Sequence, residues 1–128
     1  MKSMFVAIMI FLQTVTLMGS EPPVFVNDML DAIALSENNN KDIVVIFTAD
    51  WCKYCQIMKK DIEQDQKIVS DKIICYIDID NHNNKDIIKQ YKVKTIPDYC
   101  ILRKKIEIKR TRGYTTKANF IKWIQDDK

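Results

Sequence analysis

The sequence predicts a three-layer α/β domain with a mixed central sheet. In the first half of the chain, apolar runs typical of buried strands alternate with amphipathic segments typical of helices. Near the C-terminus, two strand-like runs follow each other directly and precede an amphipathic helix. Alternation implies parallel strands joined by crossover helices, and the adjacent runs imply an antiparallel edge. Helices are then expected on both faces of the sheet.

Hydrophobic periodicity gives the expected position of each element. The strands are expected at residues 24–26, 43–47, 72–79, 99–103 and 106–110. The helices are expected at residues 29–35, over a segment that includes 56–68, at 87–91 and around 120–124. Asn27 or Asp28 is expected to cap the first helix, and Thr115 or Thr116 the last. Four residues of the second helix are expected to face the sheet: Tyr54, Ile57, Met58 and Ile62.

Length and composition fit a single domain behind a separate N-terminal segment. The chain has 128 residues, of which 47% are hydrophobic, and contains only two glycines and three prolines. The domain is expected to span residues 21–128. Because 20 Lys and Arg residues barely exceed 17 Asp and Glu residues, charge gives no reason to expect nucleic acid as a partner.

Residues 1–20 have the pattern of a secretory signal peptide. Lys2 precedes an apolar run at residues 4–12, and the segment ends in Gly19-Ser20. The run is too short for a membrane span and is interrupted by Gln13. Removal of the segment is expected, with a retained membrane anchor as the alternative. We therefore expect a periplasmic or secreted protein in an oxidising compartment.

The chemically most reactive feature is the Cys-x-x-Cys pair of Cys52 and Cys55. It stands where the apolar run 43–47 gives way to the second helix. Free N–H groups and the macrodipole at a helix N-terminus stabilise a thiolate, so Cys52 is expected to react readily at neutral pH. Cys55 lies one helical turn further, within reach of the Cys52 sulfur. The pair is therefore expected to form and break a disulfide.

A structural disulfide or half of a zinc site is the alternative interpretation of this pair. Zinc requires two further ligands. The other cysteines, Cys75 and Cys100, fall in predicted strands and are not spaced as a second pair. We therefore expect no metal site.

Three motifs together resemble the thioredoxin superfamily. They are the run 49–55 (Ala-Asp-Trp-Cys-Lys-Tyr-Cys), the sequence Thr95-Ile96-Pro97 some forty residues later, and Gly113 before the last helix. The resemblance extends from about Val24 to the C-terminus. It implies a thioredoxin-like fold, with three layers around a mixed central sheet, for residues 21–128.

The resemblance also implies a role for each residue of the motifs. Cys52 is the attacking cysteine and the more exposed of the two, and Cys55 is the resolving cysteine. Trp51 shields one side of the disulfide. Pro97 follows a cis peptide bond and faces the cysteines, while the backbone of Ile96 pairs with an extended substrate.

The chain departs from the thioredoxin pattern at several positions. Lys53-Tyr54 replaces the usual Gly-Pro between the cysteines, and Lys53 adds positive charge beside Cys52. Ile46 stands where thioredoxins carry a buried Asp, and Tyr76 where a Lys is usual. We therefore hypothesise that Asp98, after the cis-proline, or a water takes over some proton transfer. The family's sheet order also places Cys75 and Cys100 too far apart to bond, so both are expected to be buried free thiols.

The expected function is thiol–disulfide exchange on exported proteins, in the reducing direction. The Ala-Asp-Trp-Cys run resembles exported reductases that receive electrons from a membrane protein. The expected partners are protein disulfide or dithiol substrates and such an electron donor; no cofactor is expected, and the chain is expected to be a monomer. Two alternatives stay open: a disulfide oxidase or isomerase, and a redox-inert thioredoxin-like binding module.

Overall fold

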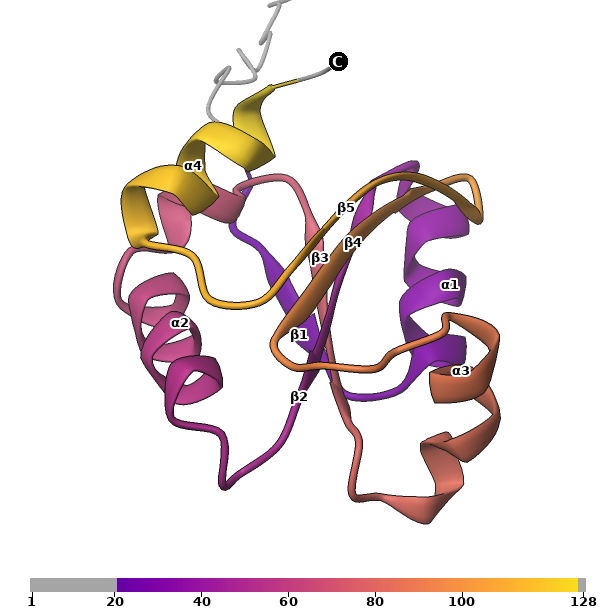
Figure 1. The fold of residues 1–128 in the computed structure, drawn as a ribbon. Coiled ribbons are helices and arrows are strands. Elements are labelled where there is room, and N and C mark those ends of the chain that lie inside the picture. The colour runs from indigo at the N-terminus through magenta and orange to yellow at the C-terminus, as the bar shows by residue number, and fades with distance from the viewer. Residues whose placement is uncertain (1–20, 127–128) are drawn as a thin grey trace, which may run out of the picture.

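A mixed sheet of five strands forms the middle layer in the computed structural model, which describes residues 21–126 (Figure 1). The strands are β1 (Val24–Val26), β2 (Ile43–Thr48), β3 (Ile73–Asp78), β4 (Asp98–Arg103) and β5 (Ile106–Arg112). Their order in the sheet is β1-β3-β2-β4-β5. Strands β1, β3 and β2 run parallel, and β4 and β5 are antiparallel to their neighbours, as the sequence predicts. The expected signal segment, residues 1–20, lies outside the described residues.

Helices cover both faces of this sheet. They are α1 (Met29–Asn39), α2 (Lys53–Gln64), α3 (Lys85–Gln90) and α4 (Lys117–Gln125), with the 3-10 turns η1 (Gln66–Val69) and η2 (His82–Asn84). Helices α2 and α4 lie on one face, and α1 and α3 on the other (Figure 1). Asp28 caps α1 and Thr116 caps α4, each by accepting backbone N–H hydrogen bonds. Within residues 21–126, no helix has the length and apolar character needed to cross a bilayer.

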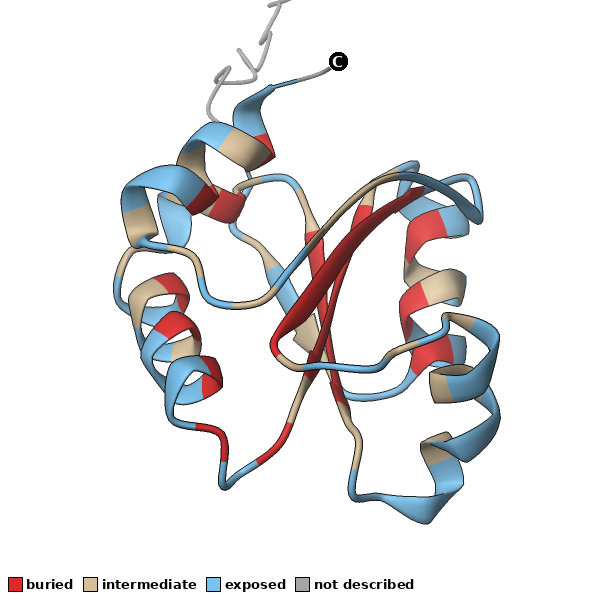
Figure 2. Ribbon diagram, in the orientation of Figure 1, coloured by how far each residue is buried: buried red, intermediate tan, exposed pale blue. Residues whose placement is uncertain are grey.

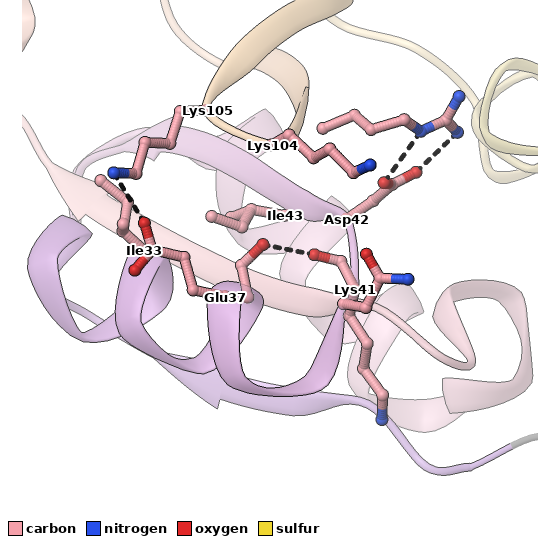
Figure 3. A pocket seen from close by; sticks show the side chains of 10 residues that line it. Ile33, Glu37, Lys41, Asp42, Ile43, Lys104 and Lys105 are labelled. Carbon is pink, nitrogen blue, oxygen red and sulfur yellow. Dashed lines mark hydrogen bonds and ion pairs between the residues drawn. The ribbon is translucent and has the colours of Figure 1, made fainter.

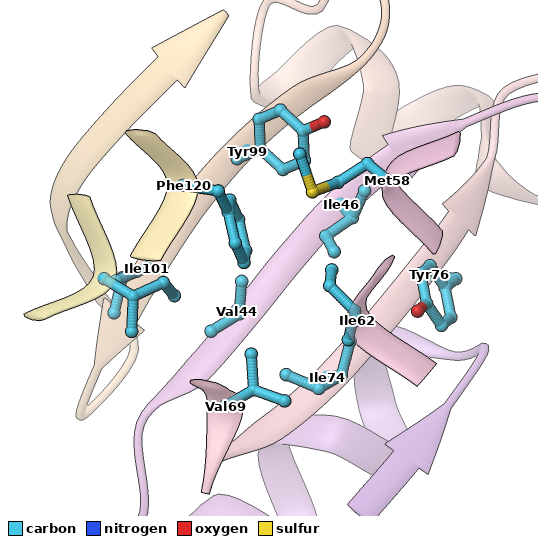
Figure 4. Packing of buried hydrophobic residues seen from close by; sticks show 11 residues of the cluster. Val44, Ile46, Met58, Ile62, Val69, Ile74, Tyr76, Tyr99, Ile101 and Phe120 are labelled. Atoms are coloured by element: carbon cyan, nitrogen blue, oxygen red, sulfur yellow. The ribbon is translucent and has the colours of Figure 1, made fainter. Parts of the chain in front are cut away.

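Strand β2 is buried on both faces because it lies at the centre of the sheet. Val44 and Ile46 pack toward α2 and α4, and Val45 and Phe47 pack toward α1 and α3. Figure 2 shows the buried residues concentrated on the central strands, and Figure 4 shows the cluster beneath α2 and α4. This double burial explains why the run is apolar at every position, since neither face of the strand meets water. The C-terminal end of β2 leads directly into the Cys-x-x-Cys pair.

The end and the buried face of α2 differ from the prediction. The helix begins at Lys53 and ends at Gln64, and residues beyond Asp65 form the separate turn η1. Its buried residues are Cys55, Met58 and Ile62, at spacings of three and four. Tyr54 and Ile57 precede Cys55 and Met58 by one position, about 100° around the helix axis, and are 50% and 38% exposed. The prediction that Tyr54 and Ile57 face the sheet is therefore wrong.

Cys75 and Cys100 lie on opposite sides of Val45 in the sheet. Cys75 on β3 and Cys100 on β4 both pair with Val45 on β2, so a whole strand separates them. Both are free and fully buried, as the resemblance implies. Burial raises the pKa of each thiol from 9.0 to about 12, so both stay protonated at neutral pH.

Candidate active site

Cys52 and Cys55 form a disulfide at the start of α2. Their Cα atoms are 5.2 Å apart. Cys52 is the N-cap residue of the helix, and the backbone N–H of Cys55 donates a hydrogen bond to Cys52 Sγ at 3.2 Å. The helix start therefore already directs an N–H group at this sulfur. The same contact and the helix dipole favour a thiolate when the disulfide is reduced.

Both cysteines are largely covered, and Cys52 is the more accessible. Cys52 is 7% exposed and Cys55 3%. They pack with Ala49, and Ile79 and Ile96 lie against this cluster. Cys52 is therefore the more exposed of the two cysteines, as the resemblance implies.

The cis-proline loop lies against the cysteine pair. The Ile96–Pro97 bond is cis, and the Ile96 side chain contacts the cysteine cluster. Pro97 O accepts a hydrogen bond from Gly113 N–H at 2.7 Å, which joins this loop to the end of β5. Gly113 has a φ of +87°, a conformation that L side chains rarely adopt, which is why a glycine ends β5. The structure thus brings together all three motifs that the sequence singles out.

Trp51 is exposed but held in place. It is 68% exposed, and its Nε1 donates a hydrogen bond to Asp80 Oδ2 at 2.8 Å. Asp80 follows β3 in the sequence, and nothing in its local pattern indicates this contact. Beside Trp51 lies a groove of about 330 Å³, which reaches the cis-proline loop. The other residues that line this groove are Ile79, Ile88, Val93, Lys94, Thr95 and Ile96.

An aromatic pair lies on another part of the site. The Tyr54 ring packs against the ring of Tyr114 with centroids 4.5 Å apart. Tyr114 follows Gly113, is 53% exposed, and was not anticipated from the sequence. Lys53, the first residue of α2, is exposed next to Cys52. The two residues between the cysteines therefore place a cation and an aromatic ring at the entrance to the disulfide.

Asp98 has a structural role in the fold. Its side chain is fully buried and accepts two hydrogen bonds from Arg110, at 2.8 and 2.7 Å, and Arg112 Nε lies 3.4 Å from its Oδ2. The hydrogen bonds from Arg110 to Asp98 raise the pKa of the guanidinium further. Successive side chains of a strand face opposite sides of the sheet, so Asp98 faces away from the side of Tyr99 and shares the side of Cys100. That side is the one opposite to α2. Both carboxylate oxygens bind arginines on that face, away from the cysteines. The hypothesis that Asp98 transfers protons for the cysteines is therefore wrong.

A second cavity, of about 400 Å³, lies at the opposite end of β2 from the cysteines (Figure 3). It is bounded by the end of α1 and the turn between β4 and β5. Its charged side chains largely satisfy one another, with Arg103 bound to Asp42 and Lys105 to Glu37. This cavity is therefore separate from the candidate active site. Among residues 21–126, no group of three or more His, Cys, Asp or Glu side chains is placed to hold a metal ion.

The family model described as Thioredoxin matches residues 27–126. The chain belongs to the thioredoxin family. "Thioredoxin H-type" of Fagopyrum esculentum is 30% identical over 78 residues, which cover 61% of this chain and 66% of that protein. "Thioredoxin Y1, chloroplastic" of Arabidopsis thaliana is 27% identical over 89 residues, covering 70% of this chain and 51% of that protein. The chain thus spans between half and two thirds of the length of these two relatives.

Solved structures share the fold of this chain. The thioredoxin of Fasciola hepatica superposes with a TM-score of 0.67 at 23% identity, over 82% of this chain and 99% of that one. Trxlp of Edwardsiella tarda gives a TM-score of 0.69 at 17% identity, over 80% of this chain and 99% of that one. These matches confirm the predicted fold class. Thioredoxins are thiol–disulfide oxidoreductases, and the chain carries its cysteine pair at the active-site position of the family.

Proposed function

We propose that this chain is a thiol–disulfide oxidoreductase that reduces disulfides of exported proteins. The observation that carries the proposal is the position of Cys52 at the N-cap of α2, where Cys55 N–H donates to its sulfur. A thiolate at that position is stabilised and nucleophilic. A purely structural disulfide has no need of a sulfur at a helix start with a groove beside the neighbouring Trp51.

The proposed reaction begins at Cys52, the more exposed of the two cysteines. The Cys52 thiolate attacks one sulfur of the substrate disulfide, and the other substrate sulfur leaves as a thiolate. Cys55 then loses its proton and attacks Cys52 Sγ, which forms the Cys52–Cys55 bond and releases the second substrate thiolate. The substrate gains two electrons and the cysteine pair loses two. A reduced partner must then restore the dithiol, and we assign this step to a membrane protein that donates electrons.

Substrate binding is assigned to the residues around the disulfide. The backbone of Ile96, before Pro97, offers hydrogen bonds to an extended substrate segment, and the groove beside Trp51 accepts its side chains. Tyr54 provides an exposed aromatic surface, and Lys53 adds positive charge next to the attacking sulfur. The export pattern of residues 1–20 supports a periplasmic or secreted location. N-terminal sequencing of the protein recovered from its native host tests removal of that segment.

Insulin reduction in the presence of dithiothreitol tests the activity. We expect the protein to accelerate precipitation of the insulin B chain, and a Cys52→Ser variant to lose this effect. Equal rates with and without the protein would favour a redox-inert binding module. Equilibration of the cysteine pair with glutathione tests the direction, because a strongly reducing potential supports a reductase and an oxidising one supports an oxidase or isomerase.

A further inference from the structure

Two buried phenol hydroxyls lie in the apolar layer between α2 and the sheet. Tyr76 on β3 and Tyr99 on β4 both pair with Ile46, so the three residues lie side by side on the same face. Within residues 21–126, neither hydroxyl has a hydrogen-bond partner. A buried hydroxyl without a partner costs free energy, which a phenylalanine at the same position would avoid. The two hydroxyls therefore call for an explanation.

The Tyr99 hydroxyl lies near the first turns of the redox helix. Cys55, Met58 and Ile62 form the buried face of α2, and the last two belong to the same cluster as Tyr99. In Figure 4, the Tyr99 hydroxyl points toward the Met58 side chain. Met58 is one helical turn from Cys55, so the polar end of Tyr99 is directed toward the part of α2 that carries the resolving cysteine.

The electrostatic surroundings of Tyr99 agree with this direction of its hydroxyl. Burial, and after it the interaction with Tyr114, raises the pKa of Tyr99. Tyr114 packs against Tyr54, the residue before Cys55. The other end of Tyr99 is apolar, because its ring contacts Phe120 and Trp123 of α4. Tyr99 therefore extends from α4 toward the start of α2.

The Tyr76 hydroxyl serves a different part of the helix. Lys59 lies over the Tyr76 ring at 5.1 Å, and burial followed by Glu63 and Tyr99 raises the pKa of Tyr76. These α2 residues follow Cys55 by one to two turns. The titratable and charged groups around the layer are thus Tyr114 at the end of Tyr99, and Lys59 and Glu63 at the end of Tyr76. Because both phenols stay protonated at neutral pH, they can donate hydrogen bonds but cannot act as bases.

We propose that Tyr99 is a positioning residue whose hydroxyl, directed toward the start of α2, stabilises Cys55 Sγ as that sulfur becomes a thiolate. The inference rests on the proposed function, since it concerns the resolving step. In that step Cys55 releases its proton to solvent, its thiolate attacks Cys52 Sγ, and the bond from Cys52 to the substrate sulfur breaks. Tyr99 neither gains nor loses a proton. It stabilises the negative charge on Cys55 before the attack.

A single turnover with one equivalent of a chromogenic aryl disulfide separates the two steps. Attack by Cys52 releases the first aryl thiolate, and resolution by Cys55 releases the second. The rate of the second release is expected to rise with pH around a midpoint. We expect Tyr99→Phe to move this midpoint up by about one pH unit, and so to slow the second release about tenfold at pH values below it. The first release should be unchanged. Tyr99→Phe keeps the ring contacts with α4, so the variant retains its packing.

Tyr76→Phe is the matched control, because it removes an equally buried hydroxyl from the other side of Ile46. It should leave both phases and both pH profiles as they are. The inference is overturned if Tyr99→Phe leaves the second profile in place, or if both variants shift it equally. Absence of any second release in the unaltered protein overturns the proposed function and this inference with it.

Discussion

The buried ion pair between Asp98 and Arg110 gives the sharpest prediction about stability. Asp98 is fully buried directly after Pro97, and the Arg110 side chain is only 14% exposed. Replacing Arg110 by Met leaves the carboxylate with the longer contact to Arg112, at 3.4 Å. Loss of one partner of a buried pair costs about 3–5 kcal/mol, and we expect about 3 kcal/mol because Arg112 stays in place.

Urea unfolding measures this loss. With a slope of about 1.5 kcal/mol per molar urea, Arg110→Met lowers the midpoint by about 2 M. Arg103→Met is the matched control, because Arg103 binds Asp42 with the same two-bond geometry but has a half-exposed side chain. Its cost is expected to stay below about 1 kcal/mol. Equal losses for the two variants would refute the argument that burial makes the Asp98 pair important.

Three further predictions concern other parts of the chain. The pKa of Cys75 and of Cys100 is higher in the folded state than in the unfolded state, so above pH 9 unfolding releases protons. The contribution of each buried thiol to the unfolding free energy is therefore complete below pH 9 and is lost as the pH rises toward 12. The loss amounts to at most about 1.4 kcal/mol per pH unit for each thiol. Urea titrations of a variant with both redox cysteines replaced by serine should show this slope, and an alanine at either thiol should reduce it. Asp80→Ala removes the 2.8 Å hydrogen bond to the indole of Trp51. In a protein that also carries Trp123→Phe, the fluorescence anisotropy of Trp51 should therefore fall. An unchanged anisotropy would contradict a restraining role for this hydrogen bond. Tyr114→Ala removes a ring contact and should lower the unfolding free energy by about 1 kcal/mol in urea, whereas no loss would show that the contact is not stabilising.

The parts of the fold that sequence reasoning predicts are those with a local signal. The run from Ile43 to Phe47 is apolar at every position, which identifies a central strand. The cysteine pair follows that strand directly, so its place at a helix start is also a local property. Ile96-Pro97 could be placed beside the cysteines only through the resemblance to thioredoxins, because some forty residues separate the two motifs.

The missed contacts join residues that are distant in sequence and have no periodic pattern. Trp51 binds Asp80, 29 positions away, and a single acidic residue in a turn does not indicate such a partner. The error at Tyr54 has a different cause. Tyr54 and Ile57 have the three-residue spacing of an apolar helix face, but the helix buries the neighbouring face, which includes Cys55.

Asp98 shows how chemistry alone can mislead. An acidic residue next to the cis-proline is a reasonable proton carrier when only the sequence is considered. Its partner Arg110 belongs to a strand whose charges are typical of an exposed edge. The alternation of β4 directs the carboxylate to the sheet face opposite α2, where Arg110 and Arg112 bind it. Which face a residue occupies depends on strand register, and register was not established from the sequence.

Trapping of a mixed disulfide tests the central claim most directly. A Cys55→Ser variant cannot complete resolution, so it should retain a disulfide-containing substrate through a bond to Cys52, and peptide mass mapping should locate that bond. The matched Cys52→Ser variant should retain none, because Cys55 is more deeply buried. A bond found on Cys55, or equal trapping by both variants, would contradict the assignment of Cys52 as the attacking cysteine.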